Sequence, residues 1–318
     1  MFPDQEKDKR AYYSVMYSVP EELLEILERD YDYETIDRIL ASGDSDRPTA
    51  IRVNTEKISV TAFSEKLRQN GITVERGSMN DTSLLISGYD YIRKVPGFFD
   101  GEFVVQDQSS CLAVKAAGIN EGDLVVDVCA APGGKTMYAA MLTGSEGHVI
   151  SRDLIDKKTE LIEENIERLG LSNVTVQVHD AREFDEELTG KADVVIADLP
   201  CSGLGIMGRK NDIKYHVSME SVKELAQLQR EILDTVCRYV KPGGTLVYST
   251  CTIDSIENDE NAVWFADTHD FSLCGIDDVV PEHGGERGFV TLHQGIDECD
   301  GFFISKFRAD SNNQIGQE

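Results

Sequence analysis

Short apolar segments and amphipathic segments alternate along the chain from Gly122 onward. The apolar segments have the length of strands and occupy residues 124–128, 147–152, 174–178, 192–198 and 244–249. Helical periodicity appears at residues 134–142, 156–169, 219–239 and 257–267. This alternation predicts parallel strands in one sheet with helices on both faces, completed by further strands near 271–273 and 302–307. The predicted fold class is therefore α/β, with a Rossmann-like sheet.

The segment before residue 109 follows a different pattern. Apolar residues at helical spacing predict two short helices within residues 20–40, and a strand, a helix and two strands follow at 49–54, 60–70, 72–75 and 83–87. This order is typical of a small α+β domain. We predict an N-terminal helical segment over residues 1–45, a small α+β domain over 46–108, a large α/β domain over 109–309 and a polar tail over 310–318.

Composition predicts the cellular compartment in which the chain works. The longest apolar runs fall far short of the roughly 20 residues that span a bilayer, so we expect no membrane segment. The N-terminus carries no pattern of a secretory signal. The 7 cysteines are scattered without close pairing, which favours reduced thiols, and their spacing predicts no metal site. We expect a cytoplasmic protein without a metal.

A small-residue turn follows the first strand of the large domain. In an open α/β sheet the carboxyl end of this strand is where a nucleotide-like ligand lies. Small residues let the backbone approach the ligand, and the new helix offers free N–H groups. The candidate cofactor-binding residues are Cys129, Ala130, Ala131, Pro132, Gly133, Gly134 and Lys135. A tight turn without a ligand is the alternative, and the acidic residues of the next strands argue against it.

Three aspartates, Asp153, Asp180 and Asp198, follow successive strands. A carboxylate after the second strand can accept hydrogen bonds from both ribose hydroxyls, and Asp180 could hold an adenine amino group in the same way. Each aspartate could instead be a helix cap or a turn residue. A nicotinamide enzyme would need Gly-x-Gly-x-x-Gly in the first turn, which this sequence lacks. The pattern therefore favours S-adenosylmethionine as the cofactor.

Two cysteines follow strands that should end beside this cofactor, Cys201 in Asp198-Leu-Pro-Cys and Cys251 in Ser249-Thr-Cys. Carbon 5 of cytosine becomes nucleophilic only after a group adds to carbon 6, and a thiolate is well suited to add and later leave. Asp198 could partner N3 of the ring, and a base must then remove the proton from carbon 5. We expect a structural role for the other five cysteines, Cys111, Cys129, Cys237, Cys274 and Cys299.

These motifs together resemble the Sun or RsmB-type family of bacterial rRNA cytosine-5 methyltransferases, which is related to the eukaryotic NSUN enzymes. The matching stretches cover nearly the whole chain and lie at residues 47–54, 96–107, 129–135, 198–203, 212–214, 225–229, 249–252 and 300–303. The resemblance implies a class I S-adenosylmethionine-dependent methyltransferase sheet preceded by an RNA-recognition-like domain. It also implies that Cys251 is the covalent nucleophile, that Cys201 aids product release, and that the cofactor lies against the residues named above.

The resemblance further implies an RNA partner, with small-subunit rRNA as the favoured substrate. Candidate RNA contacts are Arg47, Arg52, Arg209, Lys210 and Lys214, although each arginine could equally serve a structural ion pair. The net charge of -27 opposes a general basic footprint, so the basic groups would have to act locally or with help from a partner.

Two departures from the family pattern stand out. The helical NusB-like domain that often precedes these enzymes is absent from the sequence, which predicts a shorter relative or a catalytic fragment with weakened RNA affinity. Asn211 stands where the family usually has proline. The alternatives are a tRNA cytosine-5 methyltransferase, a ribosome-assembly protein without catalysis, and a nicotinamide oxidoreductase. Retention of Cys201, Cys251 and Asp198 argues against loss of catalysis.

Overall fold

The N-terminal segment forms three helices that pack on one another. In the computed structural model, which describes residues 3–44, 47–281, 283 and 285–311, these helices are α1 (Lys9–Tyr17), α2 (Glu21–Asp30) and α3 (Tyr33–Ala41). Asp8 and Asp32 accept hydrogen bonds from the first turns of α1 and α3. Helices α2 and α3 confirm the two predicted helices, whereas α1 was not predicted because it buries only Tyr13 and so lacks an apolar stripe.

A small antiparallel sheet follows these helices, with strand order β2-β3-β1-β4. Its strands are β1 (Thr49–Val53), β2 (Thr73–Arg76), β3 (Ser83–Ser87) and β4 (Phe103–Val105), and α4 (Val60–Gln69) packs against it. The predicted strand, helix, strand, strand order is therefore present. Strand β4 was not predicted, because its 3 residues are too few to show a periodicity.

The large sheet has strand order β10-β12-β9-β8-β5-β6-β7, with β11 paired to β12. The strands are β5 (Leu124–Asp127), β6 (His148–Asp153), β7 (Val174–Val178), β8 (Ala192–Asp198), β9 (Val240–Thr250), β10 (Phe271–Leu273), β11 (Phe289–Leu292) and β12 (Phe302–Ala309). Strands β5 to β9 are parallel, and β12 runs antiparallel to β9. The chain order reverses across β5 and β8, which places a ligand crevice at their carboxyl ends.

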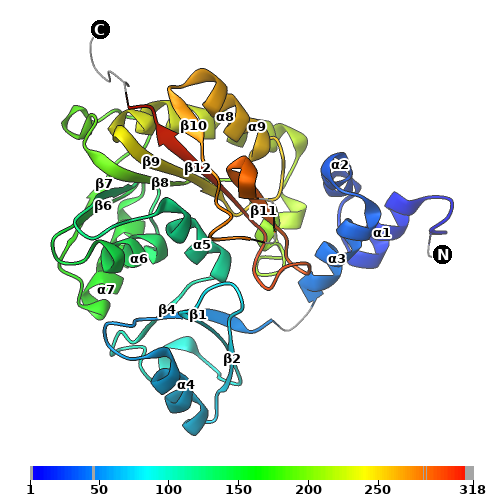
Figure 1. Cartoon of the computed structure of the whole chain (residues 1–318). Helices are drawn as coiled ribbons and strands as arrows, with labels where there is room; N and C mark the ends of the chain where they lie inside the picture. Colours follow the sequence, from blue (N-terminus) through cyan, green and yellow to red (C-terminus); the bar gives the residue numbers. More distant parts are fainter. Residues whose placement is uncertain (1–2, 45–46, 282, 284, 312–318) are drawn as a thin grey trace.

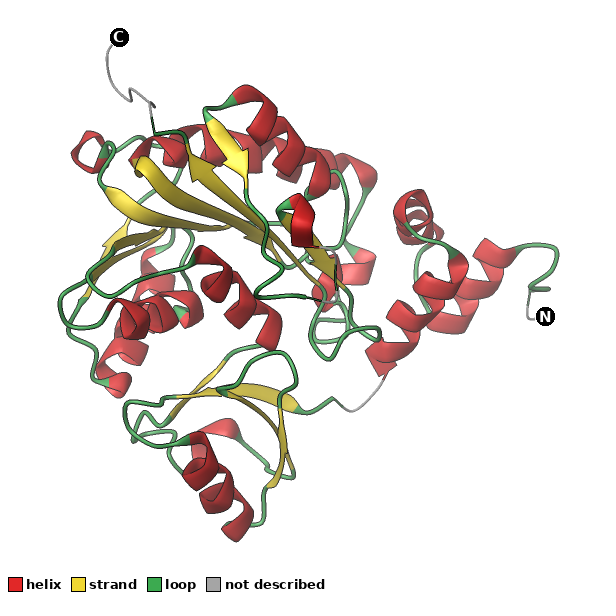
Figure 2. Ribbon diagram, viewed as in Figure 1, coloured by secondary structure: helices red, strands yellow, loops and turns green. Residues whose placement is uncertain are grey.

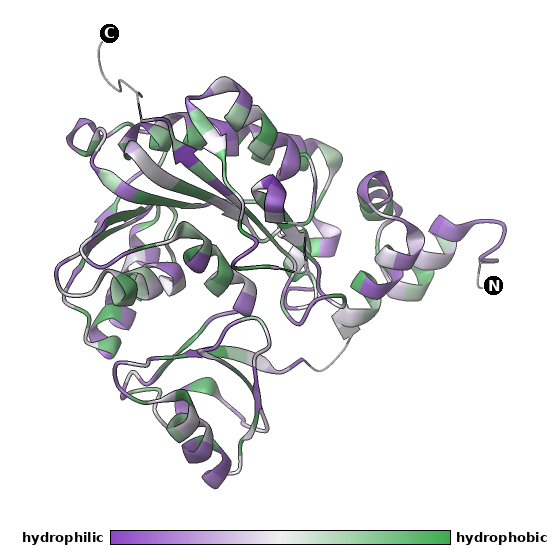
Figure 3. Ribbon diagram, in the orientation of Figure 1, coloured by the Kyte–Doolittle hydropathy of each residue, from purple (hydrophilic) through white to green (hydrophobic). Residues whose placement is uncertain are grey.

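Helices cover both faces of this sheet, as predicted (Figures 1 and 2). They are α5 (Gln108–Ala117), α6 (Gly134–Thr143), α7 (Asp156–Leu169), α8 (Met219–Val236) and α9 (Asp259–Thr268). Consecutive strand residues feed opposite cores: Val125 packs with α5 and α6, and Val126 packs with α8 and α9. In Figure 3 hydrophobic segments lie along the strands of the large sheet and alternate with hydrophilic segments along the helices.

Residues 45–46 and most of the predicted polar tail, residues 312–318, lie outside the described residues. The predicted domain boundaries stay predictions, although β1 to β4 fall between residues 46 and 108. No helix of the described ranges is long and apolar enough to cross a membrane.

Candidate active site

The turn between β5 and α6 is shaped for close approach by a ligand. Gly133 ends the turn at φ +100, and a Cβ there would lie 3.2 Å from Cγ2 of Ile162, so glycine relieves both backbone strain and crowding. No side chain caps the first N–H groups of α6. These N–H groups are therefore free to donate to a polar or anionic ligand group.

Asp127 ends β5 with one oxygen unpartnered. Its Oδ2 accepts from the Thr136 hydroxyl at 2.7 Å, whereas Oδ1 is buried without a hydrogen bond. Burial raises the pKa of Asp127 to about 7, and the charges of Asp198 and Asp153 act in the same direction. Sequence reasoning missed Asp127, although an acidic residue within a buried apolar strand was visible in the printed sequence.

The second-strand aspartate is held against the turn. Asp153 is 7% exposed, and its two carboxylate oxygens accept from the backbone N–H groups of Ala131 and Ile155, each at 3.2 Å. A carboxylate has further lone pairs free after these bonds, so it can still accept from hydroxyl groups. The free helix N–H groups, the cramped glycine and the unpartnered Asp127 oxygen together fit an adenosyl cofactor.

Asp180 is engaged by its own neighbour. The Arg182 guanidinium and backbone N–H donate to both its oxygens at 2.6 to 3.1 Å. This contact lowers the pKa of Asp180. Asp180 could accept from an adenine amino group only through its remaining lone pairs.

The two predicted catalytic cysteines lie together. Asp198 at the end of β8 pairs in register with Ser249 of β9, and the loops that leave these parallel strands bring Cys201 and Cys251 side by side. Their Sγ atoms are 3.3 Å apart, within hydrogen-bonding distance for a thiol and a thiolate, and both cysteines are free.

The pair of sulfurs is electrostatically asymmetric. The hydrogen bond from Cys201 lowers the pKa of Cys251, and Lys135 and Lys210 act in the same direction against burial and Asp198. The bond to Cys251, burial and the charge of Glu257 all raise the pKa of Cys201. The arrangement favours a thiolate on Cys251 and a thiol on Cys201.

Four other cysteines contrast with Cys251. Burial raises the pKa of Cys111 to about 11 and that of Cys237 to about 12, and it raises the pKa of Cys129 and Cys299 further. Neutral buried thiols behave as small hydrophobes, so a structural role stays the prediction for these four cysteines.

Lys135 and Asp198 form an ion pair beside the two sulfurs. Nζ of Lys135 lies 2.7 Å from Oδ2 of Asp198 and 5.0 Å from the ring centre of Phe302, and Ser249 donates to Oδ1 at 2.8 Å. Both Asp198 oxygens are thus already acceptors. Within this pair Lys135 carries the N–H groups that can donate to a ligand, and Asp198 holds Lys135 in place.

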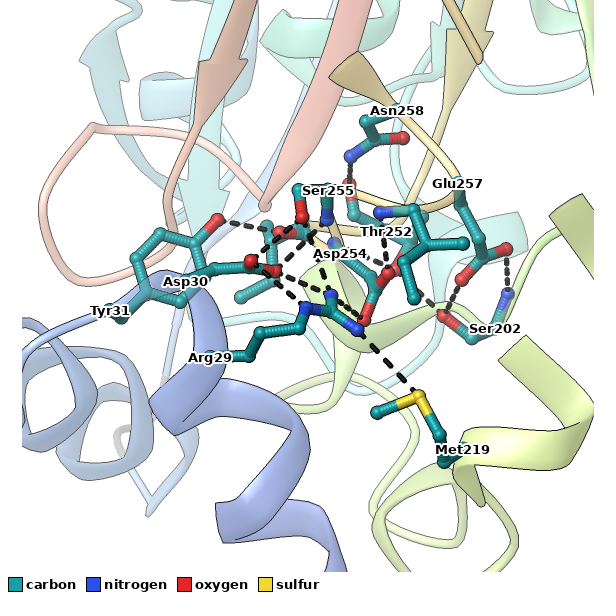
Figure 4. A network of polar contacts seen from close by, with 12 residues as sticks. Arg29, Asp30, Tyr31, Ser202, Met219, Thr252, Asp254, Ser255, Glu257 and Asn258 are labelled. Atoms are coloured by element: carbon teal, nitrogen blue, oxygen red, sulfur yellow. Dashed lines mark hydrogen bonds and ion pairs between the residues drawn. The ribbon is translucent and has the colours of Figure 1, made fainter. Parts of the chain in front are cut away.

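The loop after Cys251 is tied to the N-terminal helices (Figure 4). Arg29 donates to Asp254 at 2.8 Å, Asp30 accepts from the backbone N–H and the hydroxyl of Ser255, and the Tyr31 hydroxyl donates to the Ile253 carbonyl at 2.5 Å. Sequence reasoning missed these residues because their partners are more than 200 positions away. An isolated Arg-Asp-Tyr gives no local signal of such a contact.

The predicted RNA contacts divide into two groups. Arg47 and Arg209 share Asp300 at 3.0 and 3.2 Å, beside a cavity of about 230 Å³ that Arg209 and Asp300 help to line. Lys210 is exposed and Lys214 half-buried on the loop next to them. Gly205, in the segment that leads into this loop, donates its backbone N–H to the Cys251 carbonyl at 3.0 Å, and the charge of Lys210 lowers the pKa of Cys251.

Arg52 does not fit a phosphate contact. Its side chain is 1% exposed, its guanidinium lies 4.3 Å from the ring centre of Tyr138, and Nε donates to Gln106 at 2.8 Å. Arg52 is buried and so is not placed for the predicted RNA contact, and the structure shows it bound to an amide oxygen and an aromatic ring rather than in the ion pair expected as the alternative.

The strand order, the crevice and the residues around it define a class I methyltransferase fold with a paired-cysteine site. Two family models match the chain: "16S rRNA methyltransferase RsmB/F" over residues 115–308, and the RsmF/B-like ferredoxin-like domain over residues 19–90. The chain belongs to the RsmB/F family of 16S rRNA methyltransferases. This confirms the predicted family, the fold class and S-adenosylmethionine as the cofactor of that class.

Individual relatives agree with this assignment. The chain is 37% identical to the probable ribosomal RNA small subunit methyltransferase B of Bacillus subtilis (strain 168), over 92% of this chain and 66% of that protein. It is 32% identical to the ribosomal RNA small subunit methyltransferase F of Escherichia coli (strain SMS-3-5 / SECEC), over 86% of this chain and 60% of that protein. A methyltransferase homolog from Pyrococcus horikoshii has a similar structure, with a TM-score of 0.80 and 26% identity over 93% of this chain and 97% of that one. The chain thus spans less than two thirds of these two curated relatives.

Proposed function

We propose that this protein is an S-adenosylmethionine-dependent RNA methyltransferase that forms 5-methylcytosine, with Cys251 as the covalent nucleophile. The observation that carries the proposal is the 3.3 Å separation of the Cys201 and Cys251 sulfurs at the ends of two adjacent parallel strands. A structural pair of buried thiols would not need the Lys135–Asp198 ion pair beside it.

The residues between β5 and α6 are proposed to hold the cofactor. The backbone of residues 129–135 would contact it, Asp153 would accept from its ribose hydroxyls, and Asp180 would contact the adenine. Asp127, with its unpartnered oxygen, joins this proposed set. When bound, S-adenosylmethionine supplies a methyl group that is electrophilic because it sits on a sulfonium.

The first half of the proposed reaction makes carbon 5 nucleophilic. The Cys251 thiolate forms a bond to carbon 6 of cytosine, and the electron pair of the C5–C6 double bond moves toward carbon 5 and the N3 side of the ring. A proton shared between Lys135 and Asp198 neutralises the charge that develops at N3. Carbon 5 then takes the methyl group.

The second half restores the aromatic ring. Once Cys251 is a thioether its negative charge is gone, so Cys201 can release its proton to solvent. The proton at N3 returns to the Lys135–Asp198 pair. The Cys201 thiolate then removes the proton from carbon 5, the C5–C6 double bond re-forms, and the electron pair of the C6–S bond returns to Cys251. One proton is released per methyl group transferred, and the two sulfurs end in their starting state.

The proposed substrate is small-subunit rRNA, and the proposed location is the cytoplasm. Both curated relatives are named as ribosomal RNA small subunit methyltransferases. Lys210, Lys214, Arg209 and Arg47 lie on or beside the loop next to the cysteine pair and are the proposed RNA contacts. The target cytosine would have to be unpaired or flipped out to meet Cys251.

Covalent trapping tests the proposal. The full chain is incubated with S-adenosylmethionine and small-subunit rRNA that contains 5-fluorocytosine, whose fluorine blocks the final proton removal, and adducts are resolved on denaturing gels. We expect an adduct in the wild type that is lost in Cys251→Ala and kept in Cys201→Ala. Loss in Cys201→Ala alone would reverse the two roles. If tRNA but not rRNA is trapped, the substrate class is wrong, and absence of any adduct would contradict the covalent mechanism.

A further inference from the structure

Glu257 is a buried carboxylate that the proposed chemistry does not use. Its side chain is 0% exposed, and it lies on the loop that also carries Cys251. It accepts from the backbone N–H of Ser202 at 2.9 Å, from the Ser202 hydroxyl, and from Nε2 of Gln229 at 2.9 Å (Figure 4 shows the contact with Ser202). The loop that carries Cys251 is therefore hydrogen-bonded to Ser202, the residue that directly follows Cys201.

Further hydrogen bonds fix the backbone on either side of Cys201. Gln229 of α8 also donates to the carbonyl of Pro200, directly before Cys201, at 2.9 Å. The hydroxyls of Ser202 and Thr252, which follow the two cysteines, are 2.7 Å apart. These contacts hold the backbone on both sides of Cys201 and so set where its sulfur meets Cys251.

Glu257 is a buried carboxylate without a cationic partner among the described residues, which is unusual for a residue with a purely structural role. Among the described residues its hydrogen-bond donors are neutral, and no cation forms an ion pair with it. Burial is the largest cause that raises the pKa of Glu257 to about 7, and nearby Asp254 acts in the same direction. A buried unpaired carboxylate is costly, so a neutral glutamine would serve a merely structural contact better.

We propose that Glu257 is a positioning residue that keeps the proton of the sulfur pair on Cys201, and thereby leaves Cys251 as the thiolate nucleophile. This inference rests on the proposed function, because it explains why one cysteine of the pair attacks. The negative charge of Glu257 on the Cys201 side disfavours a second negative charge there. On the other side, Lys135 of α6 and Lys210 favour the thiolate of Cys251, and Asp198 of β8 opposes it.

Thiol alkylation of the full chain without RNA or methyl donor tests the inference. Iodoacetamide labelling is followed peptide by peptide, and the ratio of early labelling at Cys251 to that at Cys201 is measured at pH 8. We expect Cys251 to react first in the wild type, and the ratio to fall about tenfold in Glu257→Gln, as a relative pKa change of one unit would give. Glu257→Asp, which keeps the charge, should restore most of the preference.

Glu260→Gln is the matched control, because it removes one negative charge from an exposed position of the same segment. Its ratio should equal that of the wild type. An unchanged ratio in a folded Glu257→Gln protein would overturn the inference. If that variant does not fold, the wild type decides: its ratio should rise as pH increases through about 7, where Glu257 ionises, and a flat ratio from pH 6 to 8 would overturn the inference.

This measurement is separate from the trapping experiment. Suppose that the Cys251 to Cys201 alkylation ratio depends on Glu257 but no RNA adduct forms. The proposed function would then be wrong, while the inference that Glu257 keeps the proton on Cys201 would stand. If an RNA adduct forms at Cys251 but the alkylation ratio is the same with and without Glu257, only the proposed role of Glu257 would be wrong.

Discussion

Nη2 of Arg29, at the end of α2, lies 2.8 Å from Oδ2 of Asp254, which is 225 residues further along the chain and three positions after Cys251. Asp254 is 2% exposed, and burial raises its pKa even with Arg29 beside it. The N-terminal helices thus neutralise a charge buried in the loop that follows the proposed nucleophile.

Arg29→Ala should destabilise the protein and reduce methyl transfer. Removing the guanidinium leaves the buried Asp254 charge without a partner. Because Arg29 itself is partly exposed, we expect the free energy of unfolding to fall by about 2 kcal/mol, which is below the range for fully buried pairs. Urea unfolding measures this loss. The control is Lys7→Ala, whose partner Asp4 is largely exposed, and its stability should not change. Equal stability of Arg29→Ala and wild type would show that the contact does not support the loop.

Lys135→Met should slow catalysis far more than it weakens cofactor binding. It leaves Asp198 without its cation and removes the proton that we propose neutralises N3, so we expect a fall in kcat of at least about 100-fold. Steady-state kinetics and calorimetric titration with S-adenosylmethionine separate the two effects. Lys158→Met, which removes an exposed lysine 4.0 Å from Asp153, is the comparison and should change kcat little. A loss confined to cofactor affinity would contradict the role of Lys135 in the chemical step.

Asp127→Asn should flatten the dependence of stability on pH. Because the folded pKa of Asp127 is raised to about 7, the folded state holds a proton that the unfolded state loses above about pH 4, so stability falls as pH rises from about 4 to 7. Each unit of raised pKa corresponds to about 1.4 kcal/mol. Glu257, also raised to about 7, acts in the same window, so the variant should remove only part of the slope. Unfolding free energies measured from pH 4 to 8 check this, and an unchanged slope would show that Asp127 is ionised throughout.

Lys210→Ala and Arg52→Met should separate RNA binding from folding. Loss of an exposed phosphate contact at Lys210 should weaken RNA binding and reduce the slope of log affinity against log salt by about 1. Arg52→Met should leave RNA affinity and its salt slope unchanged while altering stability, because Arg52 lies inside the protein against Tyr138. Filter binding at several salt concentrations measures both. A reduced slope in Arg52→Met would restore the original prediction of an RNA contact.

The large α/β domain could be predicted from the sequence because its signals are local. Strand length and helical periodicity were sufficient to identify β5 to β9 and helices α6 to α9, since each element's apolar residues face a core that its own spacing already implies. The parallel order then predicts that Cys201 and Cys251 approach each other, because adjacent parallel strands end at the same edge. Strands β4 and β11 escaped prediction because they are short and form only by pairing with β1 and β12.

Side-chain partners were decided by the tertiary structure alone. Nothing near Glu257 in the sequence indicates that it accepts a hydrogen bond from Ser202, and nothing near Arg29 indicates that it pairs with Asp254. The same holds for Arg52, whose burial depends on the packing of α6 over β1 rather than on its neighbours. The sequence by itself determined which residue types stand at the strand ends, because periodicity is a property of adjacent residues. Which charges face each other was determined only when segments far apart in the chain packed together, because electrostatic and hydrogen-bond partners are matched by distance in space.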